Sequence, residues 1–258
     1  MQKIQQNFLK NTISVSEFRC PSCSKKYLLK DGLEYCFHCT EVALVDKQLG
    51  KEASEWIKNR EMDEILDVFK YHSLINRDLE LAAFDTFIPK NESQKEALLK
   101  SQEYVESFNG VDGLFFLGEP GRGKSHLAAS IAKSLTKRKV SCIFISLPRL
   151  LTELKNSYNK NSEVSEKDIL RAMQKTDLLI LDDIGADRAK DDKGSSWARG
   201  KTFEVLDSRL GKSNVITTNY GSKELIQMYG ERDFSRMVQN TTPIKISGKN
   251  YRFEGLGG

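Results

Sequence analysis

The sequence has no long apolar run and no strong excess of one charge. Its longest apolar stretches, such as LLIL at 178–181, are far shorter than the roughly 20 residues of a membrane-spanning helix. The opening residues, MQKIQQNFLK, contain no signal-peptide core, so we expect a cytoplasmic protein with no membrane contact. The 258 residues include 40 Lys and Arg and 36 Asp and Glu, so positive and negative charges nearly balance. This balance permits nucleic-acid binding, but no basic arm indicates it.

Cysteine is scarce outside one short region. Four of the five cysteines lie in residues 20–39, as CPSC and CFHC, with the spacing C-x2-C-x12-C-x2-C. In a reducing compartment such pairs favour a metal over disulfides, and four thiolates typically form a closed, structural Zn²⁺ site. We therefore predict that Cys20, Cys23, Cys36 and Cys39 bind zinc within a small module over residues 1–45. His38 is the alternative to Cys39 as fourth ligand.

The rest of the chain divides into a charged stretch and a region of alternating strands and helices. Residues 46–83 are predicted to form a helical linker. Over residues 84–258, short apolar runs flanked by helical patterns indicate a parallel sheet covered by helices on both faces. These runs are GLFFLG, VSCIFIS, DLLILDD, NVITTN and PIKIS. The predicted fold is α/β, with a parallel five-stranded sheet preceded by a small zinc-ribbon-like domain.

The stretch GEPGRGKS at 118–125 fits the phosphate-loop pattern G-x-x-x-x-G-K-[ST], and it lies between a predicted strand and a predicted helix. Its glycines let backbone N–H groups turn toward phosphate, and the helix N-terminus adds partial positive charge. Lys124 is expected to reach the β- and γ-phosphates, and the Ser125 hydroxyl to hold Mg²⁺. The predicted nucleotide contacts are Gly118, Glu119, Pro120, Gly121, Arg122, Gly123, Lys124, Ser125 and His126.

Two carboxylates and an amide follow neighbouring predicted strands. Asp182 is predicted to complete the Mg²⁺ shell, and Asp183 to orient or deprotonate the attacking water. Asn219 ends the next strand, where it either reaches the γ-phosphate or serves as a turn residue. Arginine stabilises the charge that builds on the γ-phosphate, often from a neighbouring subunit. The candidates are Arg232, Arg236 and Arg252, each of which has a solvated surface charge as its alternative.

The order of these motifs resembles the AAA+ helicase loaders of the DnaC/DnaI type, bacterial or phage. The resemblance runs from about Phe84 to Arg252, through GEPGRGKSHLA, DLLILDDIGAD, SSW with FEVLDSRL, NVITTN, ERDFSRM and NYR. It implies an AAA+ P-loop core in which each motif residue has a role. By this resemblance, Lys124 and Ser125 form the Walker A motif, and Asp182 and Asp183 form the Walker B motif. The resemblance also makes Asn219 the first sensor and Arg252 a second sensor on a short tail. It makes Arg236 the arginine finger of the next subunit, with Arg232 beside it.

The resemblance also implies an ATP-dependent loader that binds the replicative hexameric helicase and single-stranded DNA, with ATP, Mg²⁺ and Zn²⁺ as cofactors. It implies self-association through the ATPase interfaces, and residues 1–45 look like the module that grips the helicase. Asp183 is shorter than the Glu often found in such sites, so we expect slow hydrolysis. Asp187 and Thr218 replace the family's usual Glu and Ser, both conservatively.

Two other functions share this motif series. A transposition helper ATPase has the same core, but the zinc module argues against it, because those proteins usually begin with a helical piece. A phage competitor of host helicase loading, with a relic ATPase, is the other. The complete set of ATPase residues argues against that relic.

Overall fold

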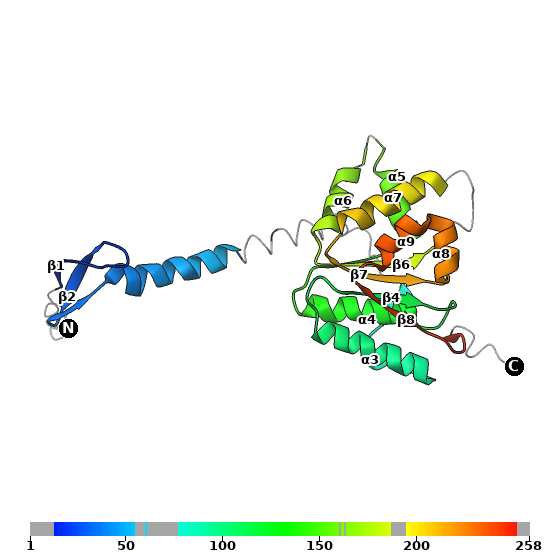
Figure 1. The fold of residues 1–258 in the computed structure, drawn as a ribbon, viewed down its shortest axis with the longest axis horizontal. Helices are drawn as coiled ribbons and strands as arrows, with labels where there is room; N and C mark the ends of the chain where they lie inside the picture. The colour runs from blue at the N-terminus through cyan, green and yellow to red at the C-terminus, as the bar shows by residue number, and fades with distance from the viewer. Residues whose placement is uncertain are drawn as a thin grey trace, which may run out of the picture. The chain divides into compact units, whose positions relative to one another are not determined.

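The computed structural model describes residues 13–54, 60, 77–159, 161–162, 164–186 and 195–251. The chain divides into two compact units, residues 1–61 and 62–258 (Figure 1). The domain boundaries expected at residues 45 and 83 stay predictions. In the described part of the chain, no helix combines the length and apolar character needed to cross a bilayer.

The N-terminal unit is a small antiparallel sheet followed by a helix. Its strands are β1 (Ser14–Arg19), β2 (Lys26–Lys30) and β3 (Leu33–Tyr35), in the order β1-β2-β3. Asp31 and Gly32 join β2 to β3 with φ of 54° and 82°, the conformation that favours Asp-Gly in a two-residue hairpin turn. A π-helical turn, η1 (His38–Val42), continues as α-helix to residue 54. This helix therefore runs through the expected module end at residue 45.

The larger unit is an α/β domain whose five strands are all parallel to their neighbours, which confirms the predicted fold class. The strands are β4 (Gly113–Leu117), β5 (Cys142–Ser146), β6 (Leu178–Ile184), β7 (Ser213–Thr218) and β8 (Thr241–Lys245). Their order is β5-β6-β7-β4-β8. The last strand begins two residues earlier than PIKIS, because Thr241 already pairs with Gly113.

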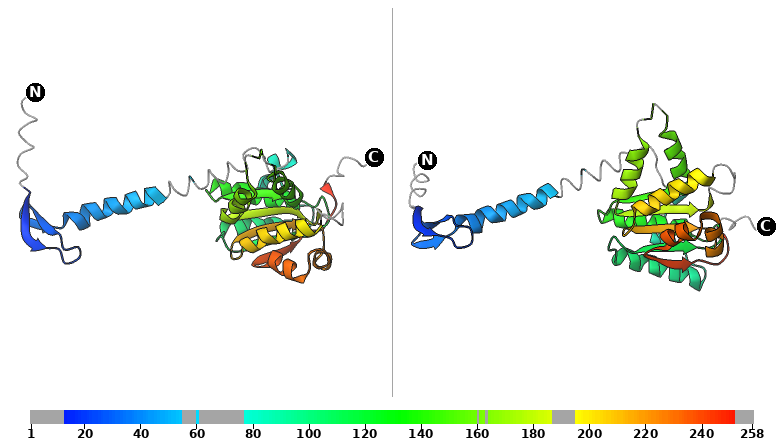
Figure 2. Two further views of the ribbon diagram at one scale, coloured as in Figure 1. Left: turned by 90° about the horizontal axis from the view of Figure 1, so that it is seen from above. Right: turned by 45° about the horizontal axis from the view of Figure 1, so that its top comes forward.

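Helices cover both faces of this sheet (Figures 1 and 2). They are α2 (Arg77–Glu80), α3 (Glu92–Glu106), α4 (Lys124–Lys137), α5 (Leu147–Asn156), α6 (Glu166–Lys175), α7 (Ser195–Ser208), α8 (Ser222–Tyr229) and α9 (Glu231–Val238), with a 3-10 turn η2 (Phe84–Thr86). Asn91 caps α3, accepting a hydrogen bond from the Gln94 N–H at 2.9 Å.

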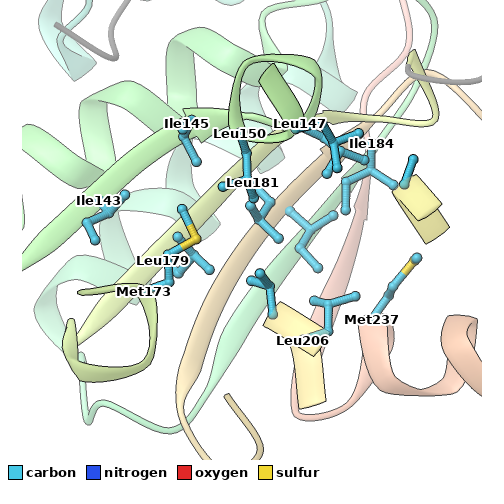
Figure 3. Close-up of a cluster of buried hydrophobic side chains, with 14 of the residues drawn as sticks. Ile143, Ile145, Leu147, Leu150, Met173, Leu179, Leu181, Ile184, Leu206 and Met237 are labelled. Atoms are coloured by element: carbon cyan, nitrogen blue, oxygen red, sulfur yellow. The ribbon is translucent and has the colours of Figure 1, made fainter. Parts of the chain in front are cut away.

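The apolar run LLIL, at the start of β6, shows why helices must pack on both faces of the sheet. Leu179 and Leu181 belong to the apolar cluster with α5 to α9 (Figure 3), whereas Leu178 and Ile180 belong to the cluster with α3 and α4. Successive side chains of a strand point to opposite faces, so a continuous apolar run requires apolar packing on both. The polar residues at the carboxyl ends of these strands are thereby held on a rigid support.

One buried arginine joins the end of α7 to the sheet. The Arg209 side chain is 1% exposed and donates to the carbonyls of Met173 and Thr176, each at 2.7 Å, and of Ser213 at 2.6 Å. It also donates to Oδ1 of Asn214 at 2.7 Å. Burial lowers the pKa of Arg209 to about 10, which still leaves it charged at neutral pH. Its hydrogen bonds compensate for the lost hydration.

Candidate functional site

The predicted phosphate loop joins the end of β4 to the start of α4. Gly121 and Gly123 adopt φ of 75° and 97°, in the left-handed region where a side chain is strained. A Cβ at Gly121 would overlap Oδ1 of Asn250, and a Cβ at Gly123 would overlap the Phe87 ring. The loop therefore needs glycine both for its curl and for the close approach of two distant segments.

Lys124 begins α4 and is only 6% exposed. Its ammonium donates to the loop carbonyls of Gly118 at 2.6 Å and Glu119 at 2.9 Å, and to Oδ1 of Asn219 at 2.7 Å. A charge this well enclosed must be compensated by hydrogen bonds, which these acceptors provide. The ammonium lies where the phosphate loop meets the carboxyl end of β7.

The predicted carboxylates join the same network. Asn219 donates through Nδ2 to Oδ1 of Asp183 at 2.7 Å. The Thr217 hydroxyl donates to Oδ1 of Asp182 at 2.6 Å and accepts from the Asp183 N–H at 2.9 Å. The structure thus brings Lys124, Asn219 and both aspartates together at one edge of the sheet.

Asp183 occupies an irregular position in β6. Its φ is 60°, and the register between β6 and β7 shifts between Leu181 and Ile184. A bulge of this kind re-aims a side chain at the end of a strand and is common beside active sites. The sequence does not reveal it, because the apolar run DLLILDD continues without a glycine to mark the irregularity.

A cavity of about 810 Å³ surrounds this network. That volume lies within the usual range of small-molecule sites, about 300 to 1,000 Å³. Its lining includes Ser125 and Asp182, whose oxygen atoms are the donors that Mg²⁺ prefers. The lining residues are Leu79, Thr86, Phe87, Ile88, Pro120, Gly121, Arg122, Gly123, Lys124, Ser125, His126, Phe144, Ser146, Arg149, Asp182, Asp183, Thr217, Asn219 and Tyr251. The cavity and its donors fit a nucleoside triphosphate with Mg²⁺.

One wall of the cavity, the segment 79–88, was not predicted. It is fastened to α4 by Lys133, whose ammonium donates to the carbonyls of Leu79 at 2.7 Å and Ala82 at 3.0 Å. His126 Nε2 lies 3.0 Å from the Ala83 carbonyl and 3.1 Å from Oγ1 of Thr86. His126 therefore lines the cavity, as expected, and also contacts this wall. The wall's apolar residues match no motif, so the sequence does not predict this part of the cavity.

The predicted arginines lie elsewhere. Arg236, on α9, places Nη2 3.7 Å from Oδ1 of Asp207, and the Arg232 guanidinium lies 4.9 Å from the centre of the Phe203 ring. Neither lines the cavity of its own chain. Arg252 and Asp187 lie outside the described residues. Arg122, within the loop, forms an ion pair with Glu119.

The four cysteines of the N-terminal unit form one cluster. All four Sγ atoms lie within 4.8 Å of one another, with 3.9 Å between Cys20 and Cys39 and 3.4 Å between Cys23 and Cys36. With Zn–S bonds of about 2.3 Å, tetrahedral sulfurs lie about 3.8 Å apart. Among the described residues the cluster contains Cys39 and not His38.

The pKa values of thiols in this cluster are also shifted, partly because their sulfur atoms lie so close together. Backbone N–H groups of Ser22 and Cys23 lower the pKa of Cys20 to about 6, whereas the adjacent sulfurs of Cys23 and Cys36 raise the pKa of Cys39 to about 12. Four thiolates this close repel one another unless a divalent cation lies between them. The cluster therefore fits a structural Zn²⁺ ion in a zinc-ribbon-like unit.

Comparison with known proteins agrees with the motif series. Residues 39–255 match the family described as IstB-like ATP binding protein. The replicative helicase loader DnaC of Escherichia coli (strain K12) is 31% identical over 179 residues, 68% of this chain and 71% of that protein. The protein of the same name from Buchnera aphidicola subsp. Acyrthosiphon pisum (strain APS) is 27% identical over 174 residues, 66% of this chain and 69% of that protein.

Solved structures share the fold. A crystal structure of the DnaC helicase loader aligns with a TM-score of 0.59 at 30% identity, covering 67% of this chain and 100% of that one. The DnaI structure aligns with a TM-score of 0.56 at 24% identity, covering 68% and 93%. The chain belongs to the IstB-like ATP-binding protein family and is a DnaC-type AAA+ protein.

Proposed function

We propose that this DnaC-type AAA+ protein is an ATP-dependent loader of a replicative DNA helicase. The observation that carries the proposal is the network of Lys124, Asn219 and Asp183 inside a nucleotide-sized cavity. It occurs in a chain 31% identical to a replicative helicase loader. ATP binding in the cavity controls whether the helicase and single-stranded DNA are held or released.

The roles of the chain's own groups follow from their positions. Lys124 contacts the β- and γ-phosphates, exchanging its loop carbonyls for phosphate oxygens. Ser125 and Asp182 hold Mg²⁺, which supplies neutralisation of phosphate charge. Asp183 orients the attacking water. In the described structure Oδ1 of this carboxylate accepts from Asn219, which orients the side chain. Because an aspartate is shorter than a glutamate, its carboxylate lies farther from the water, and we expect slow hydrolysis.

Hydrolysis requires a second copy of the chain in this proposal. Arg236 and Arg232 lie on α9, outside the cavity of their own chain. An arginine that stabilises the γ-phosphate must approach it within hydrogen-bonding distance, so these residues serve the site of the next subunit. Self-association through the AAA+ units thereby makes ATP hydrolysis dependent on assembly.

We assign the helicase contact to the N-terminal unit. Several of its large apolar side chains are exposed, including Phe18 at 71% and Leu33 at 75%. The others are Ile13, Val15, Phe37, Leu44, Val45 and Leu49. So much exposed apolar surface on a small unit is typical of a protein interaction surface. The zinc ligands hold the strands and helix that present these side chains.

The proposal is tested by capture of the replicative helicase of the same cell on the purified full chain, with ATP or with ADP. We expect capture in ATP, and reduced capture for Lys124→Ala but not for Lys137→Ala, an exposed lysine at the other end of α4. Absence of helicase in ATP would contradict the proposal. Capture of a transposase in its place would favour the transposition helper. Unchanged helicase capture by Lys124→Ala would mean that the nucleotide is dispensable and would favour the competitor with a relic ATPase.

A further inference from the structure

Tyr251, at the end of the described chain, contacts two different parts of the nucleotide cavity. Its backbone N–H donates to the Gly121 carbonyl in the phosphate loop at 2.9 Å. Its hydroxyl donates to the Ile88 carbonyl at 2.6 Å and lies 2.9 Å from Oε1 of Gln94. One residue therefore joins the phosphate loop to the wall segment 79–88.

The wall end of this connection is well ordered by further contacts. Gln94 is 1% exposed, and its Oε1 also accepts from the Lys90 N–H at 2.8 Å. The Tyr251 ring centre lies 6.1 Å from that of Phe87, and Nζ of Lys90 lies 5.3 Å from the same ring. The position of Tyr251 is thus defined by hydrogen bonds at both ends and by aromatic packing between them.

The cavity itself indicates what meets this wall. The triphosphate is expected at the loop and the carboxylates, since Lys124, Ser125, Asp182 and Asp183 line the cavity there and offer an ammonium and oxygen donors for Mg²⁺. The wall residues Leu79, Phe87 and Ile88 add an apolar surface that suits a heterocyclic base, and the Phe87 ring lies against Gly123 of the loop. A bound nucleotide would contact both the loop and this wall.

We propose that Tyr251 is a positioning residue that sets the distance between the phosphate loop and the base-binding wall. Its backbone holds the loop at Gly121, and its hydroxyl holds the wall at Ile88. The inference rests on the proposed binding of ATP at this loop. The sequence prediction assigned the neighbouring Arg252 and gave Tyr251 no role.

The substitution Tyr251→Phe isolates the hydroxyl, because the ring and the backbone N–H stay in place. The full-length variant is titrated calorimetrically, in Mg²⁺, with a non-hydrolysable ATP analogue and separately with inorganic tripolyphosphate. We expect affinity for the ATP analogue to fall about threefold to tenfold, the effect of one or two lost neutral hydrogen bonds. Affinity for tripolyphosphate, which has no base to reach the wall, should change less than about twofold.

Two further variants serve as a control and as an independent test of the same contact. Tyr158→Phe makes the same chemical change at an exposed tyrosine outside the cavity lining, and it should alter neither affinity. Gln94→Met removes the other acceptor near the hydroxyl while leaving Tyr251 intact, so it should shift the ratio of the two affinities in the same direction by a smaller factor. The ratio is measured on one protein sample, so a partly unfolded fraction does not change it.

Equal weakening of both ligands by Tyr251→Phe and Gln94→Met would overturn the inference, because it would assign Tyr251 to general stability. No weakening of either would overturn it as well. If the unmodified protein binds neither ligand, the proposed function fails first. A rise in the ATP KM at unchanged kcat in Tyr251→Phe is the matching steady-state signature of a positioning role.

Discussion

The two units of the chain treat their apolar side chains in opposite ways. In the larger unit, Leu178, Leu179, Ile180 and Leu181 are all 0% exposed, within a sheet covered on both faces. Among the described residues of the N-terminal unit, the buried nonpolar ones are Cys20 and Cys36, at 6% and 7%, while bulkier side chains such as Phe18 and Leu33 are exposed. A unit this small cannot bury a sufficient core, so we propose that a metal held by its four cysteines stabilises it. The larger unit thus supports a candidate chemical site on a buried core, whereas the N-terminal unit presents apolar side chains on its surface.

The largest expected effect is loss of the metal. Cys36→Ser should unfold the N-terminal unit, because zinc binding to such sites contributes about 10–16 kcal/mol. The larger unit should keep its melting temperature and nucleotide affinity, which calorimetry measures alongside zinc content. Cys142→Ser is the matched control, since Cys142 lies in β5, away from the cluster, and should leave zinc content unchanged. Loss of nucleotide binding in Cys36→Ser would show that the two units depend on each other for folding.

Arg209→Met makes the reciprocal test in the larger unit. It leaves three buried carbonyls and Asn214 without their donor, so we expect a loss of about 3–5 kcal/mol in the free energy of unfolding. Denaturant unfolding measures this loss, and zinc content should stay unchanged. A stability like that of the unmodified protein would mean that water replaces the guanidinium, which the described packing does not lead us to expect.

A third test changes the affinity for the ligand and not the stability of the fold. Lys124→Ala should weaken ATP binding by about 100-fold, or about 3 kcal/mol, because the ammonium is the cation nearest to the expected phosphates. Fluorescence titration with a labelled nucleotide measures the affinity, and Lys137→Ala should match the unmodified protein. Retention of full affinity by Lys124→Ala would place the triphosphate elsewhere.

The smallest effect is expected on the exposed face of the N-terminal unit. Leu33→Ser should weaken helicase binding about tenfold, roughly 1.4 kcal/mol, which is what burial of such a side chain contributes. It should leave zinc content and ATP affinity unchanged. Leu99→Ser, at a half-exposed leucine on α3, serves as the control in the same helicase titration. Equal losses for both variants would argue that the helicase contacts the larger unit as well.

Much of the larger unit was predictable because its signals are local. The five apolar runs and the glycine-rich loop each combine a sequence pattern with a backbone requirement, as at Gly121 and Gly123. In the N-terminal unit the local signals are the cysteine pairs and Asp31-Gly32, a residue pair typical of a hairpin turn. The helix that begins at His38 crosses the expected boundary at residue 45, because the last ligand pair lies at its start and nothing in the composition marks an end there.

The rest of the site depends on contacts between distant residues. Tyr251 reaches Ile88 across 163 positions, and no local pattern encodes that contact. The bulge at Asp183 comes from a shift in pairing with β7, which the apolar run hides. The roles of Arg232, Arg236 and Arg252 stay predictions, since they need either a second copy of the chain or residues outside those described.

The fastening of segment 79–88 has a mechanical consequence. Lys133 binds the carbonyls of Leu79, Glu80 and Ala82, near the first described residues of the larger unit. The helix that carries this lysine begins at Lys124, directly after the phosphate loop. One helix therefore connects segment 79–88 with the phosphate loop inside the larger unit, so we expect a displacement of that segment to change the position of the loop.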